Sequence, residues 1–388
     1  MTTSVKFTHS ELPGAPVVTG TAGSRIAMLD AVLCNGWGLL PAQSASVTNG
    51  VCTLVFATSH AFEPDIVALV DGAGTAAING EQRISATGSS SVSFAAPGVP
   101  DGPVSGTIAI KIAPAGWEKV YSGTNKAAYR SLSPDSTRAY LRVDDTNARY
   151  ARLRGYATMT DIDTGTNPTP SDDQLAGGGY LPASNSADAT ARRWIVVASD
   201  RFVHIAIANY SSYQFDYALV SAGDFPSLKA GDAYRWMVVG DPGDNSGGAS
   251  PGTYNALLTH AGSTGAYIMR GYTQTGGAIP AYLYKPGFPV PAYSGSTSHP
   301  AGPNPINNAV EICPTMVFEG VSSNGNRRGE IPGLYGIPHN LGSAFDSKSR
   351  ITAAIGLPGR TLLAVRFYGT PGAATSYRFA LDITGPWE

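Results

Sequence analysis

Hydrophobic and polar residues alternate with a period of two along most of the chain, which is the pattern of β-strands with one buried face. The first group of such segments consists of residues 51–57, 66–72, 82–88, 91–96 and 106–113. Turn-forming residues rich in Gly, Asn, Asp and Pro separate them. Five short strands at this spacing predict a small β-barrel module, which we place at residues 43–115.

The alternation continues in residues 116–388, where it predicts a larger antiparallel β-sandwich domain. The strands predicted there are residues 138–145, 149–159, 194–200, 202–210, 215–223, 233–241, 266–272, 351–357, 361–369 and 375–383. Residues 149–159 and 202–210 alternate most regularly, so we expect each to have one wet and one buried face. Residues 280–308 are too rich in proline for a central strand and predict a long loop.

A helical period is found only near the N-terminus, in residues 24–36. Apolar side chains at Ile26, Leu29, Val32 and Leu33 share one face of this helix, with Ser24 as its expected N-cap and Gly36 at its end. Residues 1–23 contain Gly and Pro and predict an extended arm. The pattern therefore predicts a mainly β chain with an arm and one short N-terminal helix in residues 1–42.

Composition points to contacts with other protein molecules. Only 14% of the residues are charged, whereas 46 are Gly and 28 are Pro. Arginine outnumbers lysine, and its planar guanidinium suits subunit interfaces. The formal net charge is −2 and there is no polybasic run, which argues against nucleic acid as a partner.

The start of the sequence, its apolar runs and its cysteines indicate the compartment of synthesis and the redox state of the thiols. The first residues have neither the basic nor the apolar segment of a signal peptide, and no apolar run is long enough to span a membrane. We therefore expect synthesis in the cytosol and no membrane insertion. The widely spaced Cys34, Cys52 and Cys313 predict neither a disulfide framework nor a metal site, and we expect them to be buried as small hydrophobic residues.

Four short patterns are candidate sources of catalytic or metal-binding chemistry. Residues 243–248, GDNSGG, differ from a serine-protease motif by an inserted Asn and predict a loop. Residues 161–165, DIDTG, leave a structural cation open. Paired carboxylates occur at Asp144–Asp145 and Asp172–Asp173, but neighbours on a strand point to opposite faces. The six histidines lack metal-ligand spacing. We thus predict no catalytic residue, no metal, no cofactor and no enzymatic activity.

Four aromatic residues are the candidate contact site. Tyr282, Tyr284, Phe288 and Tyr293 lie among prolines in the predicted loop. Aromatic side chains on a stiff loop are good anchors, because little conformational entropy is lost when they dock. They are expected either to contact a neighbouring subunit or to stack on a glycan, and the alternative is that they only cover the sheet.

Three parts of the chain resemble structural proteins of tailed bacteriophages. Residues 60–85, followed by 91–96 and 106–111, are similar to a small β module of such proteins, itself likened to the β-barrel insert of ubiquitin-activating enzymes. Pro64–Asp65 stands where Gly-Asp is usual, and Ile78 precedes the Asn-Gly turn. The other two parts resemble uncharacterised phage virion proteins and comprise residues 116–131, 138–145 and 153–166, and residues 329–339 and 377–387.

The resemblance implies a structural component of a tailed-phage virion, made in the bacterial cytoplasm. We expect a place in the distal tail or baseplate, in several copies that bind one another and other virion proteins. Residues 1–23 are expected to lie over a neighbouring subunit. The alternatives are a head decoration or head-fibre protein, a module that binds host surface glycans, and an enzyme acting on cell-wall or capsule glycans.

Overall fold

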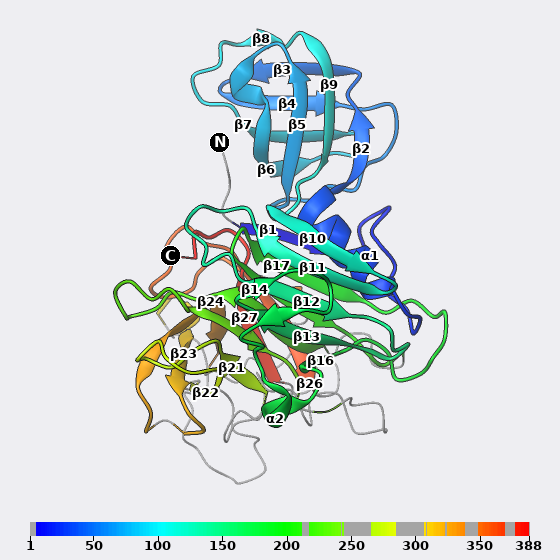
Figure 1. Cartoon of the computed structure of the whole chain (residues 1–388). Coiled ribbons are helices and arrows are strands. Elements are labelled where there is room, and N and C mark those ends of the chain that lie inside the picture. Colours follow the sequence, from blue (N-terminus) through cyan, green and yellow to red (C-terminus); the bar gives the residue numbers. More distant parts are fainter. Residues whose placement is uncertain are drawn as a thin grey trace.

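The protein is described by a computed structural model that covers residues 5–211, 217–241, 243, 265–284, 306–307, 309–322, 324–337, 348–368 and 377–387. It is mainly β, as the alternation predicts. A small barrel stands on a larger body of stacked sheets, and the short helix lies where the two meet (Figure 1).

The small barrel is built from residues 37–112. Its strands are β2 (Trp37–Pro41), β3 (Ser44–Thr48), β4 (Val51–Val55), β5 (Val67–Ala73), β6 (Gly80–Thr87), β7 (Ser91–Ala95), β8 (Gly102–Pro103) and β9 (Gly106–Ile112), and one 3₁₀ turn, η2 (Ala76–Ile78), lies between β5 and β6. All five strands predicted in this region are present. The segment that contains β2 and β3 is an additional strand, which begins before the predicted start of the module at residue 43.

The barrel closes on itself. Its strands follow the order β2-β9-β5-β6-β7-β4-β3-β8. Strands β2 and β3 are parts of one stretch, which pairs along its length with the stretch formed by β8 and β9. Between the two ladders, the Ala42 N–H donates to the Ile108 carbonyl and the Val104 N–H donates to the Ala45 carbonyl. A closed ladder leaves no unpaired strand edge.

Two further sheets form the body. A twelve-stranded antiparallel sheet has the order β1-β17-β18-β19-β20-β21-β22-β23-β24-β27-β26-β25. Its strands are β1 (Val5–His9), β17 (Trp194–Ser199), β18 (Phe202–Ile207), β19 (Ala218–Asp224), β20 (Trp236–Val239), β21 (Ala266–Ile268), β22 (Ile279–Tyr284), β23 (Cys313–Glu319), β24 (Arg327–Gly336), β25 (Arg350–Ile351), β26 (Leu362–Tyr368) and β27 (Tyr377–Asp382).

The second sheet of the body has five strands in the order β10-β11-β12-β13-β16. They are β10 (Trp117–Gly123), β11 (Lys126–Ser131), β12 (Tyr140–Asp144), β13 (Tyr150–Tyr156) and β16 (Gly179–Pro182). A separate hairpin of β14 (Thr158–Met159) and β15 (Gly165–Thr166) follows β13, and the one-turn helix α2 (Asp172–Leu175) precedes β16.

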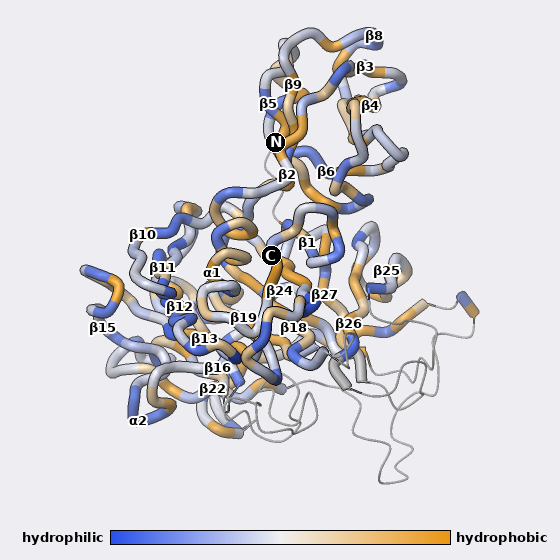
Figure 2. Tube along the Cα trace, turned by 90° about the vertical axis from the view of Figure 1, so that its right-hand side faces the viewer, coloured by the Kyte–Doolittle hydropathy of each residue, from blue (hydrophilic) through white to orange (hydrophobic). Residues whose placement is uncertain are grey.

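Strands β17 to β20 form the middle of three layers. Alternate residues of β18 belong to different apolar clusters: Val203 and Ile205 pack with the five-stranded sheet, whereas Phe202 and Ala206 pack with β24, β26 and β27. All six residues of β18 are buried, which corrects the prediction of a wet face for residues 202–210. The alternation in this segment distinguishes two buried environments. Apolar stretches lie accordingly at the centre of the body, around β1, β24 and β27 (Figure 2).

The described part of the N-terminal arm belongs to the chain's own sheet. Strand β1 pairs antiparallel with β17, from Val5 opposite Ser199 to His9 opposite Ile195. All five of its residues are buried. Residues 5–9 of the predicted arm are therefore part of the chain's own sheet, at its edge, and contact of residues 1–23 with a neighbouring subunit stays a prediction.

The N-terminal helical segment covers nearly the predicted residues, but it differs from the prediction in its cap and in the π-helical form of its second half. Helix α1 (Ser24–Leu29) continues as a π-helical segment, η1 (Asp30–Asn35), which ends before Gly36 with its φ of 67°. Ser24 is not the N-cap, because its hydroxyl donates to the Thr19 carbonyl. The Asp145 carboxylate instead accepts from the first backbone N–H groups, those of Arg25 and Ile26.

A half-buried arginine joins the barrel to the body. Arg83 on β6 donates to the carbonyl of Asp65 within the barrel and to the carbonyls of Val5, Ile383 and Thr384 in the body. These four acceptors come from three segments that are far apart in the sequence. They therefore fix the barrel against both β1 and the segment after β27.

Ion pairs surround this joint. Lys6 lies 3.0 Å from Glu81, and the His9 Nε2 lies 2.8 Å from a Glu63 oxygen. Arg350 lies 3.2 Å from Asp65. Because Lys6 is 3% exposed, its pair with Glu81 is shielded from solvent and weakly screened. The barrel is thus held in one orientation by several directional contacts.

We predict that Gly155→Ala destabilises the protein by about 1–3 kcal/mol through overpacking. A Cβ atom at Gly155 on β13 would lie 2.0 Å from a ring carbon of Trp236, in the middle layer. Gly123→Ala is the matched control, because its Cβ would meet Ile162 at an ordinary 3.5 Å. Urea unfolding followed by tryptophan fluorescence measures both. Equal unfolding midpoints for the two variants would contradict this account of the layer contact.

Candidate functional site

Two of the four candidate aromatics lie on a strand of the described structure. Tyr282 and Tyr284 are on β22, where they alternate with the buried Ala281 and Leu283. Tyr284 is 42% exposed, and Tyr282 is half-buried. The two tyrosines therefore point to the outer face of the sheet and form part of a half-exposed aromatic surface.

A third aromatic residue, from the neighbouring strand, extends this surface. Phe318 on β23 lies opposite Tyr282, and its ring centroid is 6.3 Å from that of Tyr284 in an edge-on arrangement. The other two candidates, Phe288 and Tyr293, lie outside the described residues. The predicted loop at 280–308 is wrong at its start, because residues 280–284 pair with β21 and β23. Pro280 is the second residue of β22, and proline is tolerated near the start of a strand, where its missing N–H costs little.

The paired carboxylates hold the fold together rather than facing each other. Asp145 is fully buried against Arg25, and Asp144 lies 3.2 Å from Arg142. Asp172 forms an ion pair with Arg154 on β13. Asp144 and Asp145 therefore have separate environments, and the carboxylate of Asp172 is engaged by an arginine.

The carboxylates of residues 161–165 are occupied by protein donors. Asp161 accepts from the backbone N–H groups of Asp163 and Thr164, both at 2.8 Å. Asp163 accepts from Lys126 at 2.8 Å and from Arg142 at 2.6 Å. Hydrogen bonds from these two cationic side chains hold the pKa of Asp163 below its usual value. Lys126 and Arg142 thus supply the positive charge at Asp163, where the sequence pattern allowed for a structural cation.

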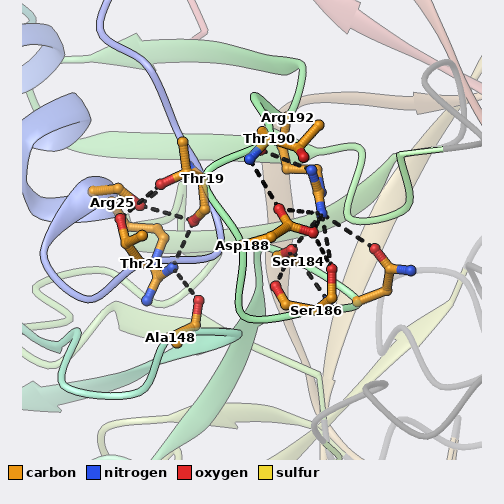
Figure 3. Close-up of polar contacts among 11 residues, drawn as sticks. Thr19, Thr21, Arg25, Ala148, Ser184, Ser186, Asp188, Thr190 and Arg192 are labelled. Carbon is orange, nitrogen blue, oxygen red and sulfur yellow. Dashed lines mark hydrogen bonds and ion pairs between the residues drawn. The ribbon is translucent and has the colours of Figure 1, made fainter.

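Arg25 is the largest buried polar group near the helix. Its guanidinium pairs with Asp145. It also donates to the carbonyls of Thr19 and Ala148, at 3.1 and 3.0 Å (Figure 3). Burial raises the pKa of Asp145 to about 6, although Arg25 and the helix N–H groups oppose this effect. The cost of removing two charges from water is offset here by many hydrogen bonds.

Arg192 organises a second polar cluster, in the loop before β17. It donates to the Ser184 hydroxyl at 2.7 Å and to both Asp188 oxygens at 3.1 and 3.2 Å (Figure 3). Hydrogen bonds from Ser186, the Thr190 N–H and Arg192 lower the pKa of Asp188 to about 2. The buried arginines therefore stabilise loops within the chain. Sequence reasoning assigned the arginine excess to interfaces and missed this role.

The environments of two cysteines disfavour thiol reactivity. Burial raises the pKa of Cys34 to about 12 and that of Cys52 to about 11, which disfavours the nucleophilic thiolate. Cys52 is buried as predicted, whereas Cys34 and Cys313 are half-buried. Within the described ranges, no three His, Cys, Asp or Glu residues are grouped so as to hold a metal ion.

Two predicted features lie largely or wholly outside the described residues. In the GDNSGG segment only Gly243 is described, and His260, His299 and His339 are not. A search of the described helices found no candidate for a membrane span.

The barrel presents an outer face without charged side chains. Neither residues 31–62 nor residues 84–100 contain Asp, Glu, Lys or Arg, and these segments supply β3, β4 and β7. On this face Thr53 lies between Ser46 and Ser93, and its hydroxyl is 2.9 Å from that of Ser93. The neighbouring Val51 and Val55 are 40% and 36% exposed. Covering this face with another protein surface would leave no charged side chain of β3, β4 or β7 without a partner.

Comparison with known proteins identifies no family. No protein-family model matches the chain, and no curated protein is significantly similar to it. Among solved structures, one that it resembles weakly is the phage phi92 endosialidase, with a TM-score of 0.16 and 8% sequence identity. The alignment covers 90% of this chain and 52% of that one, so this chain spans about half its length. A TM-score this low does not establish a common fold.

Proposed function

We propose that this chain is a structural component of a tailed-bacteriophage virion, in the distal tail or baseplate, and that it acts by assembly with copies of itself and other virion proteins. The observation that carries the proposal is the barrel's uncharged face, held at a fixed angle to the body by Arg83 and the surrounding ion pairs. A rigid block with an uncharged face is suited to being buried between subunits, where unpaired charges are costly.

Further support comes from the sequence and from the placement of charge. Three parts of the chain resemble phage virion proteins, and the first of these parts is the barrel itself. Four charged residues of the barrel, Glu63, Asp65, Glu81 and Arg83, lie at the joint with the body. Charged side chains of the barrel thus contact the body, whereas the uncharged β3–β4–β7 face is left for contact with a neighbouring subunit.

A charge placed on the uncharged face tests the proposal. In phage particles, we expect Val55→Lys to reduce incorporation of the protein by at least about tenfold, because the ammonium would be buried without a partner. Thr107→Lys is the matched control, because Thr107 is exposed on β9, outside the β3–β4–β7 face. Quantitative mass spectrometry of purified particles measures incorporation. Normal incorporation of the Val55 variant would overturn the assigned face.

The location in the particle is tested separately. Gold-labelled antibody against the protein should mark the distal tail of intact particles. Label on the capsid would replace our placement by the head decoration or head-fibre alternative, and absence of the protein from purified particles would reject the virion role altogether. Host adsorption that falls on Tyr284→Ala, with incorporation unchanged, would favour the glycan-binding alternative for the exposed aromatic surface.

A further inference from the structure

Two neighbouring turns of the twelve-stranded sheet form a compact surface. Residues 225–235 join β19 to β20, and residues 269–278 join β21 to β22. The strands are antiparallel and consecutive, so both turns lie at the same end of the sheet. Gln274 in the second turn donates to Asp232 in the first at 3.2 Å, which shows that the turns are in contact. We call residues 225–235 and 269–278 the double-turn surface.

A buried ion-pair cluster holds the double-turn surface from below. The guanidinium of Arg328 on β24 is fully buried and pairs with Asp232 and with Glu319. It also donates to the Arg270 carbonyl at 3.0 Å. Asp232 in turn accepts from the Ser227 hydroxyl at 2.7 Å. Both turns are thus fixed before any ligand binds, which reduces the entropy lost on binding.

The outer side of the surface combines aromatic rings with cations. The Lys229 Nζ lies 4.2 Å from the ring centroid of Tyr272, and the Arg270 guanidinium carbon lies 4.1 Å from that of Tyr234. Tyr272 keeps 47% of its surface exposed. The carboxylates beneath, Asp232 and Glu319, are already engaged by Arg328.

Hydroxyl groups complete the surface. Thr273 and Thr275 follow Tyr272, and their exposed hydroxyl oxygens are 2.9 Å apart. One small area therefore carries an exposed aromatic ring, positive charge and hydroxyl groups. A sugar ring with a carboxylate matches this combination. Its C–H face packs on an aromatic face, its carboxylate accepts from cations, and its hydroxyls bond to threonines.

We propose that the double-turn surface binds an acidic glycan, with Tyr272 stacking on a sugar ring and Lys229 supplying the positive charge for its carboxylate. This site is distinct from the aromatic surface at Tyr282 and Tyr284, because Tyr284 is at the opposite end of β22 from the turn. The proposal does not depend on the virion role, since the purified full chain suffices to test it.

The test is calorimetric titration of the full chain with three probes: oligogalacturonate, oligosialate and the neutral malto-oligosaccharide of similar length. We expect binding of at least one acidic probe, no binding of the neutral one, and weaker binding at high ionic strength. Tyr272→Ala and Lys229→Ala should each weaken binding by about tenfold. Tyr272→Phe should preserve it, because the ring face is retained.

Two control variants exclude general effects. Leu39→Ala removes an exposed apolar side chain of β2, outside the double-turn surface and the aromatic surface, and Lys126→Ala removes a lysine that pairs with Asp163. Both should bind the acidic probe as the unmodified chain does, with all variants shown to be folded by circular dichroism. Failure of both acidic probes to bind would overturn the proposal. So would unchanged binding by the Tyr272→Ala and Lys229→Ala variants, or equally tight binding of polyglutamate, which would indicate recognition of a protein surface.

Discussion

Arg328→Met is expected to destabilise the protein by about 3–5 kcal/mol, because it leaves the buried Asp232 carboxylate without its counter-charge. Both side chains of this ion pair are fully buried, and the Glu319 carboxylate beside them is only 15% exposed. Methionine has nearly the length of the arginine stem and fills the space, so the loss of charge pairing dominates the effect.

The adjacent residue provides the matched control for this prediction. Arg327 pairs with Glu330 on the surface, where the two side chains are 38% and 40% exposed. Arg327→Met should therefore cost less than about 1 kcal/mol. The double variant Arg328→Met with Asp232→Asn should recover part of the loss. Chemical denaturation followed by circular dichroism measures all three. A similar loss for Arg327→Met and Arg328→Met would show that pairing at Asp232 contributes little.

The second large effect concerns pH. His204 on β18 is completely buried in the middle layer, where its Nε2–H donates to the Pro332 carbonyl at 2.8 Å and its Nδ1 accepts from the Ser221 hydroxyl at 2.7 Å. These contacts suit the neutral imidazole. Burial lowers the pKa of His204 to about 4, although the hydrogen bond to Pro332 opposes this effect.

Stability should therefore fall as the pH falls from about 6.5 to about 4, because in this window the unfolded chain binds a proton at His204 and the folded chain does not. The difference in pKa corresponds to a loss of about 3 kcal/mol from this group. Above the upper limit the contribution is fully present, since both states are then neutral.

A substitution isolates the histidine from other titrating groups. His204→Gln removes the imidazole, so the free energy of unfolding of the variant should depend less on pH in this window. The comparison uses urea unfolding at a series of pH values, and His60→Gln in the barrel serves as the control that retains His204. Identical pH dependence for the unmodified chain and the His204 variant would contradict a buried neutral imidazole.

Alternation of apolar and polar residues identifies a strand well where one face of the strand packs on the core and the other faces water. It predicts the five barrel strands from Val51 to Ile112 and most strands of the body, because short runs with turns between them leave few alternatives. It predicts the surroundings of β18 wrongly, since Phe202 and Val203 face different apolar layers rather than core and water. Which layer covers a face is a long-range property that local pattern does not contain.

Proline and glycine explain why the pattern misses β24, which is one of several body strands outside the predicted ranges. Strand β24 contains Pro332 and three glycines, which normally argue against a central strand. Here Gly333 has a φ of 67°, and a Cβ at this position would lie 2.3 Å from the Trp387 ring. The Pro332 carbonyl accepts from His204. The composition of β24 therefore reflects contacts with partners far away in the sequence.

The aromatic surface and the buried ion pairs are predictable from the sequence only in part. Alternation of Tyr282 and Tyr284 with Ala281 and Leu283 was visible, but the surrounding prolines favoured a loop. The pair of Arg328 and Asp232 is separated by 96 positions, and no local signal connects them. In contrast, Asp188 and Arg192 are four residues apart, a spacing that the sequence does contain.

The Arg83 contacts impose an order on folding during synthesis. Arg83 binds the carbonyl of Ile383, which is 300 positions later in the chain. The barrel has its own closed ladder and can form soon after its last strand leaves the ribosome. Its contacts with Ile383 and Thr384 can form only after these residues have emerged. A chain that ends before residue 383 would lack these contacts, so its barrel would be held less firmly against the body. Such a fragment would be a poor building block for any ordered particle.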